Sequence, residues 1–375
     1  GSSLSARGNI SLIAQGAGAD SDILIQGSQV KAGGTVSLDA EDQIRLLAAQ
    51  NTRSTQTSNQ SSSGSIGASF GGTSGTGITL SGNRASGSGN GQETSYTNTR
   101  IEGNQVSLKS GGDTSLIGAV VAANQVKAQI GGNLTIQSLQ DTSTSTERQK
   151  SSGGSLTISP TGVPTGGSLS AGKTNIDSNY QSVTEQSGIR AGDGGFDVKV
   201  GGKTDLIGGA ITSTDKAVQE GKNHFSDLSG NTQAALQNLK LTDITNSADY
   251  KASSAGVSLG VGSQLSGSGA GVGKQDGSAA SVTTAGISGI AGNKDARTGD
   301  AETGIKPIFD KDKVKAEVQA QVAITQEFGK QAVPAASKYA DNQAIEPRRQ
   351  GNEEEAKKWD EGGAYRTAVY GGIGL

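Results

Sequence analysis

The sequence predicts a mainly β fold: a parallel β-solenoid (β-helix) of about 20-residue coils with protruding β-hairpin arms, followed by a small α-helical segment. Two landmarks within residues 103–136, an Asn-Gln-Val corner and a Gly-Gly pair, each return after 20 residues. Apolar residues alternate between the landmarks, which is the periodicity of a β-strand. The repeating residues are Gly103, Asn104, Gln105, Val106, Gly111, Gly112, Asn124, Gln125, Val126, Gly131 and Gly132, and the Gly-Gly pair returns at Gly201 and Gly202.

A repeat of this length holds two or three short strands, so a single copy cannot bury its own apolar face. Stacked copies would pair each strand with its equivalent one turn along, roughly 4.8 Å away. We therefore expect Val106 and Val126 to occupy equivalent positions on successive turns, with Gln105 over Gln125 and the two Asn residues also stacked as polar ladders. A flat antiparallel meander is the alternative, but the strict recurrence favours the solenoid.

Composition favours a thin, elongated core. Of the 375 residues 31% are hydrophobic and 3% are aromatic, and the formal net charge is −3. The absence of Cys excludes a disulfide framework and thiolate sites, and it suits a chain that crosses membranes or works outside the cell. No run of about 18 apolar residues predicts a transmembrane helix, and the charge gives no reason to expect a nucleic-acid partner. Since position 1 is not Met, we expect an internal fragment.

Coil-like segments alternate with inserts rich in Ser, Thr and Gly. The coils are expected at residues 8–50, 100–139 and 188–212, and the inserts are expected to be hairpin arms at about 51–98, 142–187 and 245–285. Coils and arms together make up residues 1–285. Residues 286–304 contain Gly, Ala and charged residues without periodicity, which predicts a linker.

Residues 305–346 are predicted to be an amphipathic helical segment. Over residues 310–331 the apolar side chains share one face at about 100° per residue. These side chains are Val314, Val318, Val322, Ile324 and Phe328. Pro334 is expected to end the helix. The face is predicted to dock on the open end of the solenoid, whose apolar interior needs a cover, or on the segment after Trp359. A short helix is also predicted over residues 232–239.

No group of residues predicts catalysis. His224 is the sole His and is interpreted as a surface residue. Residues 267–274 look like a phosphate loop but lack the required Gly and Ser/Thr positions. The aspartates Asp193, Asp197 and Asp205 lie among glycines, but their Gly-Gly pairs are not spaced as in calcium-binding nonapeptide repeats. We therefore predict no catalytic residues, no cofactor and no metal site.

The repeats resemble those of a known family. The matching features are the Gly-Asn/Ser-Gln-Val corners, the Gly-Gly-x-Thr-x-Leu-Ile-Gly repeats, the Ser-Ser-x-Gly openings of the arms and the stretch from Gly304 through Phe328, followed by Trp359 and residues 362–368. Together they resemble the haemagglutinin-repeat region and following pretoxin segment of CdiA-type contact-dependent growth inhibition exoproteins, within the filamentous haemagglutinin family. The coil repeats also occur in filamentous adhesins, whereas the later stretch is typical of toxin-delivering members.

The resemblance implies a secreted protein of the bacterial cell surface, exported by an outer-membrane two-partner secretion transporter. The repeat region would associate with the outer membrane or a surface protein of the target cell, enter its periplasm during delivery, and help to carry a C-terminal toxin encoded beyond Leu375. Residues 347–375 would be the start of a truncated pretoxin region.

The leading interpretation is a non-enzymatic delivery module. An adhesin that binds host or bacterial surfaces is the alternative, and it would lack a toxin after Leu375. A polysaccharide-acting β-solenoid enzyme is least favoured, because no clustered carboxylates recur with the coils. The arms are interpreted as contacts to a partner or a bilayer, with solvated loops as the simpler alternative.

Overall fold

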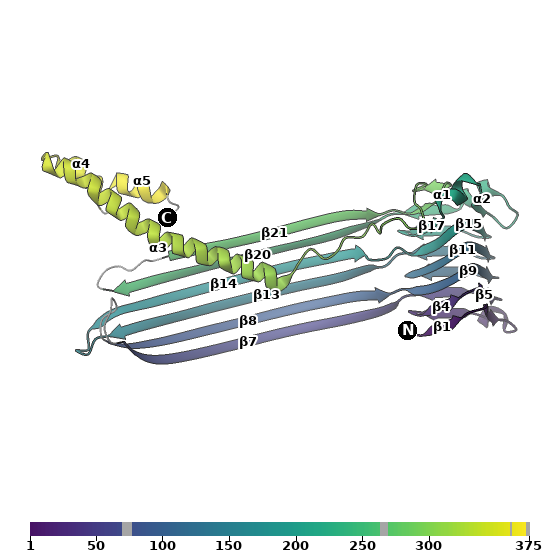
Figure 1. Ribbon diagram of the computed structural model, residues 1–375, viewed down its shortest axis with the longest axis horizontal. Helices are drawn as coiled ribbons and strands as arrows, with labels where there is room; N and C mark the ends of the chain where they lie inside the picture. Colours follow the sequence, from purple (N-terminus) through teal and green to yellow (C-terminus); the bar gives the residue numbers. More distant parts are fainter. Residues whose placement is uncertain (70–76, 263–268, 361, 373–375) are drawn as a thin grey trace.

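The computed structural model describes residues 1–69, 77–262, 269–360 and 362–372, and the chain is mainly β (Figure 1). The first sheet contains β1 (Ser3–Ala6), β2 (Ile10–Ala14), β4 (Gln29–Ala32), β5 (Thr35–Ala40), β9 (Thr99–Ser110), β11 (Ala119–Ile130), β15 (Gly188–Val200), β17 (Ala210–Thr212), β18 (His224–Ser226), β22 (Gly286–Ile287) and β23 (Ala291–Gly292). The second sheet contains β3 (Ile23–Gln26), β6 (Ile44–Leu47), β10 (Thr114–Ile117), β12 (Leu134–Gln137), β16 (Thr204–Ile207) and β19 (Leu239–Thr242). Apart from the β22/β23 pair, the strands of both sheets pair in parallel.

The third sheet is antiparallel, and helices lie at both ends of the molecule. The sheet contains β7 (Ala49–Ser69), β8 (Gly77–Thr97), β13 (Gln140–Ile158), β14 (Pro164–Val183), β20 (Ile244–Gly262) and β21 (Gly269–Thr283). The helices are the 3-10 turn η1 (Gly18–Asp20) and the α-helices α1 (Asp215–Gln219), α2 (Thr232–Gln237), α3 (Lys311–Arg349), α4 (Glu353–Lys357) and α5 (Ala364–Gly372). The helix expected at 232–239 is thus present as α2.

Strands of the parallel sheets repeat at the interval that the sequence predicts. Val106 in β9 pairs with Val126 in β11, and Leu116 in β10 pairs with Ile136 in β12. Where a coil carries a hairpin the interval is longer, so that Val36 in β5 also pairs with Val106. All five side chains are fully buried. Like residues therefore stack in columns between the sheets.

Backbone contact at the Gly-Gly corners fixes how closely the coils stack. A Cβ atom added to Gly131 would collide with the carbonyl oxygen of Gly111 one coil before, and one added to Gly132 would collide with Oδ1 of Asp113. That Asp113 oxygen accepts a hydrogen bond from the Asn133 backbone N–H at 2.7 Å. Neither glycine has positive φ. Lack of a side chain is therefore what these positions require.

The predicted polar ladder forms at Gln but not at Asn. Gln105 Nε2 donates to Gln125 Oε1 at 2.8 Å. Asn104 is exposed, and Asn124 Oδ1 instead accepts a hydrogen bond from the Gly194 backbone N–H at 3.3 Å. Strands β9 and β11 stay in register on both sides of the two Asn residues, whereas the register of β11 with β15 shifts between Ala123 and Gln125.

Hairpins leave alternate layers of the second sheet. They follow β6, β12 and β19, whereas β10 and β16 lie between these strands and lead directly back into the first sheet. Layers are roughly 4.8 Å apart, so successive hairpins begin roughly 9.6 Å apart, which is the width of two paired strands. The edge of each hairpin therefore meets the edge of the next without a gap.

The hairpins consequently pair into one six-stranded sheet, here called the hairpin sheet, in the order β21-β20-β14-β13-β8-β7. Between hairpins, β8 pairs with β13 and β14 pairs with β20 along most of their length. The sequence predicted three protruding hairpin arms and gave no sign that they pair with one another. Among the strands that the structure describes, β7 and β21 lie at the edges of the hairpin sheet, and the layer spacing brings the other hairpin edges together.

Residues 286–304 are packed, so the prediction of a linker was wrong. Ile287 in β22 pairs with Ile211 in β17 and is fully buried. Further along, Glu302 Oε1 accepts a hydrogen bond from Arg190 Nη2 at 2.8 Å. This segment extends the first sheet past its last long strands. It covers the apolar interior that an open coil would expose, which explains why a stretch without periodicity is ordered.

Helix α3 packs on the hairpin sheet, so the docking predicted for its apolar face was wrong. Its first turns lie across β20 and β21 (Figure 1), and Val314 and Val318 are buried against Ile176 and Ala252. A Cβ atom at Gly273 of β21 would collide with the carbonyl oxygen of Val318. The small residues of these strands allow an approach that the end of the parallel sheets does not offer.

The helix is also longer than predicted, because α3 continues through Pro334 to Arg349. A proline removes one backbone donor and can bend a helix without ending it. Beyond the proline the helix contacts α4 and α5, where Arg366 Nη1 donates to Asp341 Oδ1 at 2.8 Å. Packing against the following helices therefore outweighs the tendency of Pro334 to end the helix.

A buried ion-pair cluster fastens the first turns of α3 to β13. Glu147 is 8% exposed, and its two oxygens lie 2.6 Å from Lys315 Nζ and 3.0 Å from Lys311 Nζ. Burial by itself would raise the pKa of Glu147, but hydrogen bonds from Lys315 and Lys311 and their charges outweigh it and lower that pKa below its usual value. The carboxylate therefore stays charged beneath the helix.

Replacing a corner glycine should destabilise the coils. We expect Gly131→Ala to lower the free energy of unfolding by about 1–3 kcal/mol, because the added methyl group forces two backbones apart. Gly8→Ala is the matched control, since a Cβ atom at Gly8 meets no atom within 4 Å. Urea denaturation followed by circular dichroism measures both. Equal midpoints for the two variants would contradict this account of the corner.

Docking of α3 should weaken in acid. The folded pKa of Glu147 is lowered, so its ion pairs stabilise docking above the usual glutamate pKa, and this contribution is lost as the pH falls through the lowered value. We expect hydrogen exchange of α3 amides to accelerate in that window. Glu147→Gln leaves two lysines unpaired. At neutral pH it should therefore speed exchange of the α3 amides, with a loss of roughly 1–3 kcal/mol in their protection free energy.

The exposed Glu354 of α4 provides the control for this experiment. Glu354→Gln removes the same charge from α4, which follows α3, without touching the hairpin sheet. If α3 amides exchange equally slowly in both variants at neutral pH, the ion pairs do not hold the helix.

Candidate functional site

The two faces of the hairpin sheet differ in what covers them. Side chains alternate between the faces along each strand. One face, the helix face, carries Glu147, Ile176 and Ala252 and lies under α3. The opposite face, the open face, is zoned along the strands. Ser, Thr, Asn and Gln prevail near the parallel sheets, followed by basic residues and then by aliphatic residues toward the hairpin turns.

Large aliphatic side chains form an exposed band across the distal part of the open face, here called the apolar band. Its members, with their exposed fractions, are Ile66 (78%), Ile78 (53%), Leu80 (41%), Leu156 (42%), Leu169 (61%), Val257 (50%) and Leu259 (49%). Strand register brings them together, since Leu80 pairs with both Ile66 and Leu156, and Leu169 pairs with Leu259. Contiguous exposed apolar surface of this kind marks a site of interaction with a protein or a membrane.

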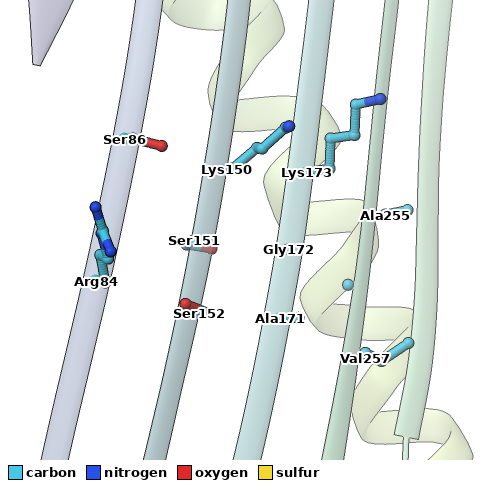
Figure 2. A pocket seen from close by; sticks show the side chains of 11 residues that line it. Arg84, Ser86, Lys150, Ser151, Ser152, Ala171, Gly172, Lys173, Ala255 and Val257 are labelled. Atoms are coloured by element: carbon cyan, nitrogen blue, oxygen red, sulfur yellow. The ribbon is translucent and has the colours of Figure 1, made fainter. Parts of the chain in front are cut away.

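Basic side chains form a second band beside the first, here called the cation band. It consists of Arg84 on β8, Lys150 on β13 and Lys173 on β14, which lie on neighbouring strands and line a shallow groove of about 440 Å³ (Figure 2). Lys150 and Lys173 are directly opposite each other in the register. Helix α3 runs behind the strands in this view, so the groove belongs to the open face.

The predicted repeat residues lie in or beside the parallel sheets and form no chemical site. Gly103, Gln105 and Val106 belong to β9, their counterparts 20 residues later belong to β11, and Gly201-Gly202 leads into β16. A Cβ atom at Gly202 would collide with Oδ1 of Asn133, so the third corner is built like the second. Their role is to set the spacing of layers from which the hairpins leave.

The predicted apolar face of helix α3 is only partly buried. Val314 and Val318 are buried, Val322 is half-buried, and Ile324 is 70% exposed. The prediction that Ile324 shares the buried face was wrong, because its side chain is exposed while those of Val314 and Val318 are buried. The Phe328 side chain lies outside the part of the chain that the structure describes.

Candidate catalytic and metal-binding residues are taken up by structural contacts or lie alone. His224 is exposed at the start of β18. Asp193 Oδ1 accepts a hydrogen bond from Thr214 Oγ1 at 2.8 Å, and this bond, with the nearby Lys216, lowers the pKa of Asp193. Within the described residues no group of three or more His, Cys, Asp or Glu side chains is placed to hold a metal ion.

The two bands were not predicted from the sequence because each hairpin contributes only a few of their residues. Lys150 and Lys173 come from one hairpin, Arg84 comes from another, and Val257 and Leu259 come from the third. A signal was present in the resemblance among the three inserts, which places their aliphatic residues at similar distances from the hairpin turns. That resemblance does not reveal that the hairpins pair, nor which alternate residues share a face.

Comparison with known proteins identifies the family. The haemagglutinin repeat family model matches residues 1–154. The chain is 40% identical over 366 residues to Toxin CdiA of Escherichia coli (88% of this chain, 11% of the relative) and 36% identical over 360 residues to Toxin CdiA of Yersinia pestis (90% and 10%). It is 37% identical over 363 residues to Deoxyribonuclease CdiA of Yersinia pseudotuberculosis serotype O:3 (strain YPIII) (90% and 32%).

The chain thus spans about a tenth of the first two relatives and about a third of the last. No solved structure matches it. Among the helices of the described residues, none combines the length and hydrophobicity needed to span a membrane. Sequence identity over nearly the whole chain and the repeat match agree with the resemblance found in the sequence, and the chain belongs to the CdiA-type proteins as a region with haemagglutinin repeats.

Proposed function

We propose that this chain is a non-enzymatic delivery region of a secreted bacterial surface effector in contact-dependent growth inhibition. In this role it associates with the outer membrane of the target cell and helps to translocate a C-terminal toxin, entering the periplasm as it does so. Export uses an outer-membrane two-partner secretion transporter. The relatives that carry toxin names and the haemagglutinin-repeat match support this assignment.

We further propose that the two parallel sheets are walls of one β-solenoid, built by residues 1–285 and closed by the following segment. The pairing of Val106 with Val126 and the buried columns support this proposal. Residues 305–346 and 347–375 are proposed to be the helical and pretoxin segments that join this body to the toxin. The solenoid then acts as a rigid support that holds the hairpin sheet away from the effector's own cell.

The apolar band is the observation that carries the delivery proposal. Seven large aliphatic side chains exposed by 41–78% on one face lose stabilisation in water and gain it in contact with a bilayer. A solvated loop has no need of such residues. An adhesin that grips a surface protein through the same band is the second candidate.

Polar substitution of the band should block delivery without unfolding the chain. We expect the variant Leu80→Ser, Leu156→Ser, Leu169→Ser, placed in the full-length protein, to reach the cell surface normally. Killing of target cells should fall about tenfold or more, since burial of even one leucine is worth roughly 1.5–3 kcal/mol. The measurements are surface display, attachment to target cells and target-cell survival.

The control carries the same change at three exposed aliphatic residues outside the hairpin sheet, Ile13, Leu24 and Leu228. It should kill as the parent protein does. Parental killing by the band variant would refute the delivery proposal. Loss of attachment together with killing would move the assignment to the adhesin.

A further inference from the structure

The cation band carries positive charge without a negative partner in the protein. Arg84, Lys150 and Lys173 are all exposed, and within the described residues none of them lies within 4.0 Å of a carboxylate oxygen. One row nearer the parallel sheets the pattern differs, because Arg148 Nη2 lies 2.6 Å from Asp177 Oδ1. The open face therefore contains an ion pair next to the cation band, whereas the three residues of the cation band form none within the described residues.

The arrangement of the three cations is electrostatically unfavourable when no anion is bound. Lys150 and Lys173 are directly opposite in an antiparallel pair, where like charges destabilise the sheet. Arg84 pairs with Ser152, two residues along β13 from Lys150, so it adds a third charge to the same patch. An anion that contacts all three would remove this repulsion.

The groove has the chemistry of a phosphate site. Ser86 and Ser152 lie among the cations and can donate hydrogen bonds, and the other lining side chains include Ala171 and Ala255. Guanidinium and ammonium groups with hydroxyl groups bind phosphate oxygens well. Small apolar side chains let a bulky head group approach the sheet.

The position of the groove beside the apolar band points to phosphate that belongs to a membrane. Arg84 follows Leu80 by four residues on β8, and Lys173 follows Leu169 by four residues on β14, which is roughly 13 Å along each strand. Side chains of Lys and Arg that flank an apolar surface reach the head groups while the apolar residues enter the acyl boundary. A second copy of the chain would offer an apolar surface but would bring more positive charge.

We propose that the cation band binds the phosphate groups of lipid head groups, so that the open face docks selectively on a negatively charged membrane. This inference rests on the proposed membrane role of the apolar band and adds to it a lipid class. Apolar contact supplies affinity for any bilayer, and the three cations supply the preference for anionic ones. Docking should therefore weaken as the salt concentration rises.

Vesicle binding by the 375-residue chain tests the proposal. The probes are vesicles of phosphatidylcholine alone and vesicles that also contain phosphatidylglycerol, with binding measured by co-sedimentation across salt concentrations. We expect clear preference for the second kind. The variant Arg84→Gln, Lys150→Gln, Lys173→Gln should lose about a hundredfold of that binding, since each cation near an anionic surface contributes about fivefold. Binding to phosphatidylcholine alone should not change.

The control replaces three exposed lysines of the parallel-sheet region, Lys127, Lys203 and Lys240, by Gln, and so changes net charge equally. Equal loss in both triple variants, or equal binding of the parent chain to both vesicles, would overturn the lipid preference while leaving the apolar contact intact. Failure of the parent chain to bind either vesicle would instead contradict the membrane role itself. Self-association through the open face would also overturn the proposal. It would appear in sedimentation as a doubled mass that the variant Leu80→Ser, Leu156→Ser, Leu169→Ser abolishes.

Discussion

Close backbone contact at the Gly-Gly corners is the constraint on which the rest of the structure depends. Because no side chain intervenes between Gly111 and Gly131, or between Asp113 and Gly132, successive strands of the parallel sheets can pair at their usual spacing. That spacing sets the distance between alternate layers, and so the distance between hairpins. If the corners were wider, β8 could not reach β13 and the hairpins would remain separate.

The hairpin sheet turns this regular spacing into a surface with two different sides. The helix face is lined by small residues and is covered by α3, with Glu147 charged beneath it between two lysines. The open face keeps its aliphatic and basic residues in water. Helix α3 packs mainly over β20 and β21 on one side of the sheet, and the two bands lie on the other side.

These contacts give the parallel sheets and the hairpin sheet different roles. The parallel sheets give stiffness, since each layer is bonded to the next and their interior holds fully buried aliphatic residues. The hairpin sheet extends from them by strands of up to 21 residues and carries both bands toward its far end. Helix α3 leaves the sheet toward this same end (Figure 1), on the face opposite the two bands.

The sequence by itself determined the features that depend on neighbours in the chain or on exact repetition. The 20-residue interval predicted the pairing of Val106 with Val126, and alternation with Ser and Gly predicted three hairpins near their observed limits. Each of these is a local or periodic pattern, so it can be read without knowing the rest of the fold.

Only the tertiary structure decided how these parts meet. Pairing of β8 with β13 joins residues of separate hairpins, and no local pattern states that register. The apolar stripe of α3 could be recognised in the sequence, but a stripe does not identify the surface it packs against, so the docking site was predicted wrongly. The end of the helix at Pro334 was also predicted wrongly. The apolar and cation bands exist only once three hairpins share one sheet. They depend on long-range register, which is why the candidate site could not be found from sequence alone.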